Sequence, residues 1–240
     1  MTGNASPARR RSVTLAGKEK VATDTYLLRF ELPPGDSIHT VAGQYVTFLL
    51  ERNGKSVTRS YSITSEPGSH AAFELVIKKV AGGFASNLLC DAPLGTAFTV
   101  LAPLGKFVVH DPGGRSALFV ATGTGIAPFF PMVQALHRDR PQTDTTLVVG
   151  YRYPADIILN ERWMRLSEAW PRFHLVNVLS RPDPEWAVKP RHVQEALRER
   201  FRDLSNFDVY ICGAPEMVSD VQDLSVQLGA SKDRIFVERY

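Results

Sequence analysis

The feature that most constrains this chain is a change of sequence pattern near residues 111–114, which read Asp-Pro-Gly-Gly. Before this break, short runs rich in β-branched and aromatic residues alternate with Gly and Pro turns. After it, apolar strand-like runs alternate with segments of helical periodicity. Because the two patterns favour different architectures, we expect a β part of about 110 residues and then an α/β part of about 125.

The β part is predicted from strand-like runs at residues 26–30, 45–49, 73–77 and 97–100. Gly and Pro breakers separate these runs, at residues 33–35, 53–54, 66–68 and 82–83. One helix is expected, at about residues 85–92. Short strands at this spacing predict a sandwich or a small barrel.

The second part is predicted to alternate strands and helices. Strands are expected at residues 117–121, 147–151, 173–179, 209–212 and 235–237. The intervening helices should end near His137, run from Asn160 as N-cap to about Ala169, span about residues 191–200, and start at Pro215. This alternation predicts a parallel, doubly wound sheet, which binds ligands at the carboxyl ends of its strands.

Composition and charge exclude several classes of function. With 44% hydrophobic and 22% charged residues, the chain reads as globular, and a formal net charge of +3 is too weak to indicate nucleic-acid binding. No apolar run reaches the roughly 18 residues of a membrane helix. Residues 1–12 are expected to form a loose tail, and the basic run 9–11 lacks the apolar core of a signal peptide, which favours the cytoplasm.

Metal chemistry is not expected either. Two widely separated cysteines, Cys90 and Cys212, cannot supply the ligands of an iron–sulfur cluster or a Cys-rich zinc site. The histidines show no metal-binding spacing. Redox chemistry would therefore need an organic cofactor.

The first motif with chemical meaning is the run Gly123-Thr124-Gly125-Ile126-Ala127-Pro128. It follows a predicted buried strand and opens a helix, where glycines let the backbone approach a ligand and free N–H groups attract a phosphate or a dipolar ring. A tight strand-to-helix turn without a ligand is the alternative. Because residue 128 is Pro, the run is not a Gly-x-Gly-x-x-Gly fingerprint.

The second motif is Arg59-Ser60-Tyr61-Ser62-Ile63-Thr64-Ser65. On a strand, Arg59 and Tyr61 would point to one face and the two serines to the other. A guanidinium suits a pyrophosphate, and a phenol can pack against a flat ring. A half-buried strand with an alternating pattern would look the same without any ligand.

The third motif runs from Val76 to Leu88, where a strand leads into Gly82-Gly83 and then a short helix. Glycines before a helix start make a second candidate anion cradle, now in the β part. The alternative is a Gly-rich turn capped by Ser86.

Taken together, these segments resemble the ferredoxin–NADP reductase superfamily. Further similar segments follow in the family's order: residues 43–46 (Gly-Gln-Tyr-Val), 103–107 (Pro-Leu-Gly-Lys-Phe), 150–152 (Gly-Tyr-Arg) with Asp156, and 212–215 (Cys-Gly-Ala-Pro). The resemblance covers about residues 13–240. It implies an antiparallel six-stranded Greek-key β-barrel that binds FAD, residues 1–112, followed by an α/β NAD(P)-binding domain, residues 113–240.

The resemblance also implies residue roles in the flavin site. Arg59 would contact the flavin phosphates, Tyr61 would pack against the isoalloxazine or ribityl, and Ser62 would lie near flavin N5, the hydride-accepting atom. The remaining flavin-binding residues implied are Ser60, Val76, Ile77, Lys78, Gly82, Gly83, Phe84, Ala85 and Ser86.

For the nicotinamide coenzyme, the resemblance implies that Thr124 and Cys212 flank the nicotinamide. A buried structural thiol is the alternative for Cys212. Glu238 would lie near the ring, and Tyr240 would cover the flavin face and step aside for the nicotinamide; a frayed tail is the alternative for Tyr240. The other coenzyme-binding residues implied are Gly123, Gly125, Gly150, Arg152, Ser180, Arg181, Gly213 and Met217.

Coenzyme choice is predicted from the segment after the third α/β strand. Arg181 suits the 2′-phosphate of NADP(H), because a planar guanidinium pairs with phosphate oxygens. The acidic residues Asp183 and Glu185 follow. Many relatives carry glycines after the tryptophan of this loop, which is Trp186 here, whereas residues 186–191 contain none. NADP(H) is favoured over NAD(H), and FAD over FMN.

The resulting hypothesis is a flavin-dependent reductase that transfers hydride between NADPH and FAD and exchanges electrons with ferredoxin or flavodoxin. Lys55, Lys78 and Lys79 could face an acidic partner, although a solvated surface is the favoured explanation. The alternatives are a reductase component of a multicomponent oxygenase or a free-flavin or haem reductase, and a non-catalytic flavin-binding electron-transfer subunit.

Overall fold

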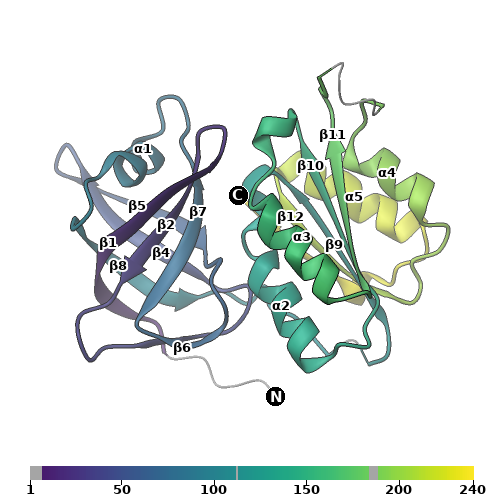
Figure 1. Cartoon of the computed structure of the whole chain (residues 1–240), viewed down its shortest axis with the longest axis horizontal. Helices are drawn as coiled ribbons and strands as arrows, with labels where there is room; N and C mark the ends of the chain where they lie inside the picture. Colours follow the sequence, from purple (N-terminus) through teal and green to yellow (C-terminus); the bar gives the residue numbers. More distant parts are fainter. Residues whose placement is uncertain (1–6, 112, 184–188) are drawn as a thin grey trace. The chain divides into compact units, whose positions relative to one another are not determined.

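The computed structural model describes residues 7–111, 113–183 and 189–240, which form two compact units. One unit contains residues up to 109 together with 127–135, and the other contains residues 110–126 and 136–240. Figure 1 shows the helices and strands of both units.

The first unit is built on antiparallel strands, as the sequence predicted. Its elements are β1 (Arg9–Ala22), β2 (Thr25–Glu31), β3 (Ile38–Thr40), β4 (Tyr45–Arg52), β5 (Lys55–Ser62), β6 (Gly68–His70), β7 (Ala72–Lys78), α1 (Phe84–Asp91) and β8 (Ala97–Leu104). Six strands form one sheet in the order β5-β4-β8-β1-β2-β7, and β3 pairs with β6. Strand β8 inserts between β4 and β1, which gives the Greek-key order that the family resemblance implied.

The sheet curls so that its two end strands approach each other. The segment after β5 meets β7 in a single antiparallel bridge between Ile63 and Leu75. Beside it, the Thr64 amide donates to the Glu74 carbonyl at 2.8 Å. This bridge closes the barrel.

The interior of the barrel is packed with aromatic rings. Phe30 and Phe48 are fully buried, with ring centroids 5.2 Å apart in an edge-to-face arrangement. Phe73 and Phe98 contact Phe30 at 5.7 and 6.0 Å. This core supports β4, β5 and β7, the strands that carry the second and third motifs.

Strand β1 begins at Arg9, so residues 9–12 of the expected loose tail lie in the sheet. Arg11 explains this, because its side chain is only 3% exposed and ion-pairs with Asp36 at 3.1 Å. Its guanidinium also donates to the Ser37 carbonyl at 3.0 Å and to the Ala102 carbonyl at 3.4 Å. A buried arginine needs such partners to offset desolvation, and they fix the start of β1.

The second unit is an α/β sandwich. Its elements are β9 (Ser116–Thr122), η1 (Gly123–Ile126), β10 (Thr145–Tyr151), α3 (Asn160–Ala169), β11 (Phe173–Leu179), α4 (Val193–Arg200), β12 (Phe207–Gly213), α5 (Pro215–Gln227) and β13 (Ile235–Arg239). Helix α2 (Phe129–Asp139) is divided, because residues 129–135 belong to the first unit and residues 136–139 to the second. The parallel sheet has the order β11-β10-β9-β12-β13. Helix α3 lies on one face, and α4 and α5 lie on the other (Figure 1). This doubly wound topology confirms the predicted fold class.

Helix α3 starts as predicted, but its cap differs. Asn160 is the first helical residue, and the N-cap is Leu159 in a left-handed conformation with φ of 54°. Leu159 is buried, and its carbonyl accepts the first helical hydrogen bond, from the Trp163 amide. Burial of this leucine sets the helix start, so Asn160 was wrongly predicted as the cap.

The Arg11–Asp36 pair predicts a pH-dependent contribution to stability. Desolvation tends to raise the pKa of Asp36, but the Ser37 amide and the Arg11 and Arg9 guanidinium groups outweigh it and hold that pKa below its usual value. Because the folded-state pKa lies below the unfolded one, the contribution is present above the unfolded pKa of about 3.9 and is lost as pH falls through the folded pKa.

We therefore expect Arg11→Met to lower the thermal unfolding midpoint by several degrees near neutral pH, with the gap from wild type shrinking in acid. Arg29→Met is the matched control, because its ion pair with Glu31 is half exposed and should contribute little. The measurement is thermal unfolding followed by circular dichroism across pH. Equal midpoints for the two variants would contradict this role for Arg11.

Candidate functional site

The second and third motifs lie on the two strands that close the barrel. The bridge at Ile63 and Leu75 sets an antiparallel register that, if continued, would place Tyr61 opposite Ile77 and Ser60 opposite Lys78. No such pairing occurs: among the described residues, β5 pairs in ladders only with β4, and β7 only with β2. The strands diverge beyond the bridge, so residues 59–61 and 76–78 each present a strand edge to the opening.

An open strand edge matters chemically because it carries backbone donors and acceptors that seek partners. A flat heterocycle with donors and acceptors on its rim, such as an isoalloxazine, is suited to two such edges. The backbone contacts predicted for Ile77 and Lys78 are compatible with this arrangement. Val76 and Ile77 bury their side chains in the core, which leaves their backbone as the usable part.

The register of β5 with β4 separates the residues of the second motif onto two faces. Arg59 lies opposite Phe48 and Tyr61 opposite Val46, whereas Ser60 lies opposite Thr47. The Tyr61 ring packs edge-on against Phe48 at 5.9 Å. Burial raises the pKa of Tyr61 to about 12, so its hydroxyl stays protonated at neutral pH. The Arg59 side chain is exposed and can reach a phosphate.

Ser60 has a structural partner that the sequence did not reveal. Its hydroxyl lies 2.9 Å from the Thr47 hydroxyl on β4. Ser62 lies on the same side of β5, opposite Tyr45. Only the β4–β5 register, which cannot be read from the motif, identifies Thr47 and Tyr45 as neighbours of the predicted site.

The third motif folds into a compact turn before α1. The Gly83 amide donates to the Val80 carbonyl at 2.9 Å, and the Val80 amide donates to the Ser86 hydroxyl at 3.2 Å. A Cβ on Gly83 would lie only 2.7 Å from the Ser86 oxygen. Glycine at position 83 therefore lets the turn close against the helix.

The start of α1 has the chemistry of a phosphate cradle. The first-turn N–H groups of a helix have no intrahelical acceptor. The N-cap here is Gly83, so no N-cap side chain accepts hydrogen bonds from them. The Ser86 hydroxyl accepts a hydrogen bond from Val80 and keeps its own proton to donate. Gly82, Phe84 and Ala85 complete this turn, and its binding of a pyrophosphate stays a prediction.

In the second unit, the first motif lies where the strand order reverses. β9 and β12 are neighbours in the sheet, and Thr122–Gly125 and Cys212–Gly213 lie at their carboxyl ends. A Cβ on Gly125 would lie 2.3 Å from the Cys212 carbonyl oxygen, and one on Gly213 would lie 2.6 Å from the Thr122 hydroxyl. The glycines thus bring two strand ends into backbone contact at the position where such sheets bind ligands.

The motif does not open directly into an α-helix. Residues Gly123–Ile126 form a 3₁₀ turn, and α2 begins at Phe129. The short turn leaves Thr124 half buried beside the β12 end, within the same unit as Cys212.

Cys212 and Glu238 lie opposite each other on β12 and β13. The Cys212 thiol is 3.9 Å from the Glu238 carboxylate, and the Cys212 residue is 2% exposed. Burial, followed by the Glu238 charge, raises the pKa of Cys212 well above its ordinary value. The thiol is therefore neutral at physiological pH and acts as a hydrogen-bond donor and a packing group, not as a nucleophile.

Tyr240 contacts the carboxyl end of β9 in its own unit. Its hydroxyl donates to the Thr122 carbonyl at 2.8 Å, and the residue remains 63% exposed. This bond was not foreseen from the sequence, and it contrasts with a frayed tail. The predicted role of Tyr240 as a cover over a flavin stays a prediction.

The residues predicted to hold the adenosine end of the coenzyme lie at the ends of β10 and β11. The Ser180 amide donates to the Tyr151 carbonyl at 3.0 Å, and the Arg181 amide donates to the Arg152 carbonyl at 2.8 Å. Arg152 and Arg181 are thus backbone neighbours, and both are exposed. Gly150 lies between Val193 and Thr122, and Met217 lies against Gly213. Glu185 and Trp186 fall outside the described residues.

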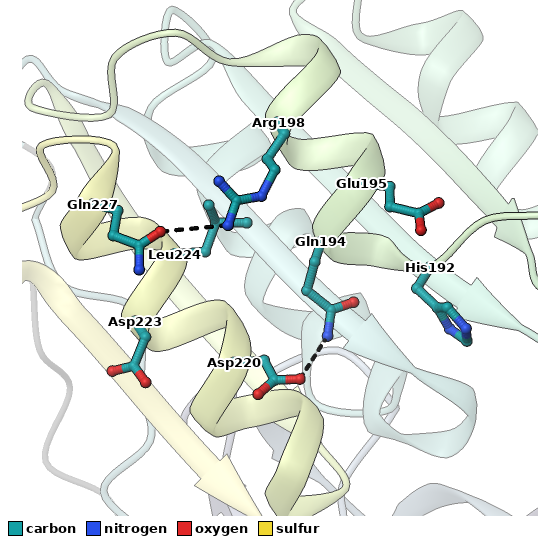
Figure 2. Close-up of a pocket in the computed structure, with 8 residues that line it drawn as sticks. All are labelled: His192, Gln194, Glu195, Arg198, Asp220, Asp223, Leu224 and Gln227. Atoms are coloured by element: carbon teal, nitrogen blue, oxygen red, sulfur yellow. Dashed lines mark hydrogen bonds between the residues drawn. The ribbon is translucent and has the colours of Figure 1, made fainter.

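A separate groove of about 460 Å³ lies between α4 and α5 (Figure 2). Gln194 donates to Asp220 at 3.1 Å, and Arg198 donates to Gln227 at 3.4 Å, so its polar side chains bridge the two helices. Leu224 lies beneath them. None of the predicted site residues lines this groove. Its hydrogen bonds join α4 to α5, so we interpret the groove as part of the packing between these two helices.

Within the described residues, no cluster of His, Cys, Asp or Glu is arranged to hold a metal ion. Over the same ranges, no helix is both long and apolar enough to cross a membrane.

Comparison with known domain families finds matches in both units. Residues 12–109 match the oxidoreductase FAD-binding domain, and residues 119–223 match the oxidoreductase NAD-binding domain. These ranges contain both glycine cradles.

Individual relatives agree. Ferredoxin–NADP reductase B of Sorangium cellulosum is 34% identical over 89% of this chain and 90% of its own length. Reductase component 2 of terephthalate 1,2-dioxygenase from a Comamonas species is 30% identical over 87% of this chain, which spans 61% of that relative. A cytochrome P450 reductase from Amycolatopsis has a TM-score of 0.86 and 26% identity over 97% of this chain and 70% of its own.

The turn at Gly83 yields the first prediction for the site. Gly83→Ala should weaken flavin binding roughly tenfold, about 1.4 kcal/mol, because the new Cβ displaces Ser86 from the turn. Titration of flavin fluorescence measures the affinity. Gly17→Ala is the control, since its Cβ would meet only the Arg29 Cβ, at 3.3 Å. Equal losses in both variants, or none in either, would refute the cradle.

The contact between Gly125 and the end of β12 yields a second prediction for the site. Gly125→Ala places a Cβ 2.3 Å from a backbone carbonyl, so we expect nicotinamide nucleotide affinity to fall at least roughly tenfold while flavin content stays unchanged. Gly114→Ala is the control: it lies in the same unit outside the predicted coenzyme-binding residues, and although its φ of +85° strains alanine, nothing lies within 4 Å of the new Cβ. Calorimetric titration with NADP⁺ and NAD⁺ measures both. Unchanged affinity in Gly125→Ala would show that this contact does not shape the site.

Proposed function

The chain belongs to the ferredoxin–NADP reductase superfamily, and on that premise we propose that it transfers hydride between NADPH and FAD and exchanges electrons with a separate carrier such as ferredoxin or flavodoxin. It is a flavin-dependent NAD(P)H oxidoreductase of that family. The choice of NADPH and the identity of the carrier are the parts that go beyond the family.

The observation that carries the proposal is the incomplete barrel closure. A sheet end that diverges after one bridge presents open strand edges next to a helix start that lacks a side-chain cap. The first suits the rim of a flat heterocycle and the second suits a phosphate, so together they fit a flavin nucleotide. A bound flavin supplies acceptance of hydride from a nicotinamide and release of electrons one at a time.

The chain's own residues bind and orient in this scheme. Arg59 and the α1 start hold phosphate charge, and Tyr61 provides a protonated, packed ring. In the second unit, the neutral thiol of Cys212 and the hydroxyl of Thr124 border the nicotinamide subsite without adding charge. Holding two reactants in fixed orientation is a major source of rate enhancement.

Preference for NADPH is supported by two arginines at adjacent strand ends. Arg181 and Arg152 are joined through a backbone hydrogen bond, so their guanidinium groups start from neighbouring positions. A 2′-phosphate is a dianion that such a pair can neutralise, whereas a free ribose gains nothing from it.

The carrier is proposed as ferredoxin or flavodoxin because the relative with 34% identity is named a ferredoxin–NADP reductase. Of the lysines expected to face an acidic partner, Lys79 is ion-paired with Asp91 at 2.6 Å, which leaves Lys55 and Lys78 as the exposed positive charges. A cytoplasmic location is part of the proposal, supported by two free, buried cysteines.

A second candidate is a reductase component of an oxygenase. The Comamonas relative supports it, because that protein is named as the reductase component of a dioxygenase. The two candidates differ only in the acceptor. Reduction of cytochrome c through added ferredoxin or flavodoxin supports the first, and reduction only of an oxygenase component supports the second. A flavin-loaded protein that reduces no acceptor, ferricyanide included, would be a non-catalytic flavin subunit.

Coenzyme choice gives a sharp prediction. With ferricyanide as acceptor, wild type should show a higher kcat/KM for NADPH than for NADH, and Arg181→Glu should lower the NADPH value at least roughly tenfold while leaving NADH nearly unchanged. Arg172→Glu is the matched control: it precedes β11 at the opposite strand end, paired with Asp144. Equal efficiency of wild type with both coenzymes, or equal losses with both in Arg181→Glu, would overturn the preference.

A further inference from the structure

Helix α1 is held at its carboxyl end by a lysine from a strand that is distant in sequence. The Lys18 ammonium on β1 donates to the Cys90 carbonyl at 2.5 Å and to the Ala92 carbonyl at 2.8 Å. Cys90 lies in the last turn of α1, and Ala92 is the C-cap. Because the last carbonyls of a helix have no intrahelical partner, Lys18 satisfies acceptors that the helix cannot satisfy itself.

The loop that follows α1 is tied to the same strand. The Gly95 amide donates to the Leu15 carbonyl on β1 at 2.8 Å. A second lysine, Lys79, pairs with Asp91 at 2.6 Å, but the Asp91 side chain is 62% exposed, and a pair this exposed contributes little. The contacts to β1 therefore fix where α1 ends on the barrel, and Lys18 supplies the part that acts on the helix itself.

The sequence of α1 leaves both ends of the helix without a matching charge of its own. Its last turn contains no basic residue, and its first turn contains no acidic residue. Because the peptide dipoles of a helix are aligned, a cation is favoured at the carboxyl end and an anion at the amino end. Lys18 supplies the cation from β1, and the amino end stays free for an anion.

The amino end of α1 is the turn that we predict to bind the flavin pyrophosphate. The helix has 8 residues, so its two ends are roughly 12 Å apart. A short regular helix holds its groups in fixed mutual positions, which makes it a precise support for a binding site. The way in which the carboxyl end is anchored therefore sets the direction of the first-turn N–H groups.

We infer that Lys18 is a positioning residue for the flavin phosphates. It anchors the carboxyl end of α1 and complements the helix dipole, and it thereby orients the first-turn N–H groups toward the pyrophosphate. The inference rests on the proposed function and adds to it a residue that lies outside all three motifs. Lys18 acts through the helix and need not touch the cofactor.

The test measures FAD affinity of the full chain by fluorescence titration. Lys18→Met should weaken FAD binding roughly fivefold, because the charge and both hydrogen bonds at the helix end are lost. Since Lys18 is exposed, this change opens no cavity in the core. Lys18→Arg should stay within about twofold of wild type, because a guanidinium also donates to helix carbonyls. Lys20→Met is the matched control, since Lys20 is exposed on the same face of β1.

Phosphorus NMR of bound FAD separates positioning from a general effect on folding. In Lys18→Met, the pyrophosphate signals should move from their wild-type positions, whereas the visible absorption band of the flavin should not. In Lys20→Met, neither should change. A purely structural role for Lys18 would lower the thermal unfolding midpoint and leave the pyrophosphate signals of the folded protein where they are in wild type.

The outcomes separate this inference from the proposed function. Equal FAD affinity in Lys18→Met and Lys20→Met would overturn the inference, and so would weaker binding with unmoved pyrophosphate signals. A loss that Lys18→Arg does not restore would also overturn it, because charge at the helix end would then not be the cause. Each of these results leaves a flavin protein. A wild-type chain that binds no FAD would instead refute the proposed function together with this inference.

Discussion

The structure of the first unit depends on a barrel that closes through one bridge. A continuous β5–β7 ladder would satisfy every backbone group and leave no place for a ligand. Instead, the bridge between Ile63 and Leu75 ends the pairing, and the strand segments at 59–61 and 76–78 separate. The aromatic core around Phe30 and Phe48 holds β4 in place. The barrel interior therefore stays packed although β5 and β7 separate. The candidate flavin site therefore lies where the pairing between β5 and β7 stops.

In the second unit, the candidate site forms where two strand ends come close together, not where two strands separate. At Gly125 and Gly213 the absence of a Cβ lets the ends of β9 and β12 come together at the point where the strand order reverses. The Thr124 and Cys212 side chains placed there are uncharged, and burial together with the nearby Glu238 carboxylate raises the pKa of Cys212. Tyr240 returns to the same loop through its bond to the Thr122 carbonyl. One unit thus offers edges and a phosphate turn, and the other offers a compact backbone cradle.

Much of this could be predicted from the sequence because local patterns determine it. Strand periodicity, the Gly-rich turns and the helix start at Pro215 were all placed correctly, since each follows from nearby residues. Features set by distant partners could not be predicted. Burial of Arg11 against Asp36 extends β1 to Arg9, and burial of Leu159 moves the cap of α3. The Thr47–Ser60 contact depends on register, and the Lys79–Asp91 pair depends on the α1 fold.

The central claim is that one unit binds flavin and the other binds the nicotinamide coenzyme that reduces it. Anaerobic mixing of the FAD-loaded protein with reduced coenzyme, with no acceptor present, tests this most directly. The account predicts that the visible absorption band of oxidised flavin disappears within a single turnover, faster with NADPH than with NADH. A protein that retains bound FAD and keeps this band unchanged with both coenzymes would contradict the account.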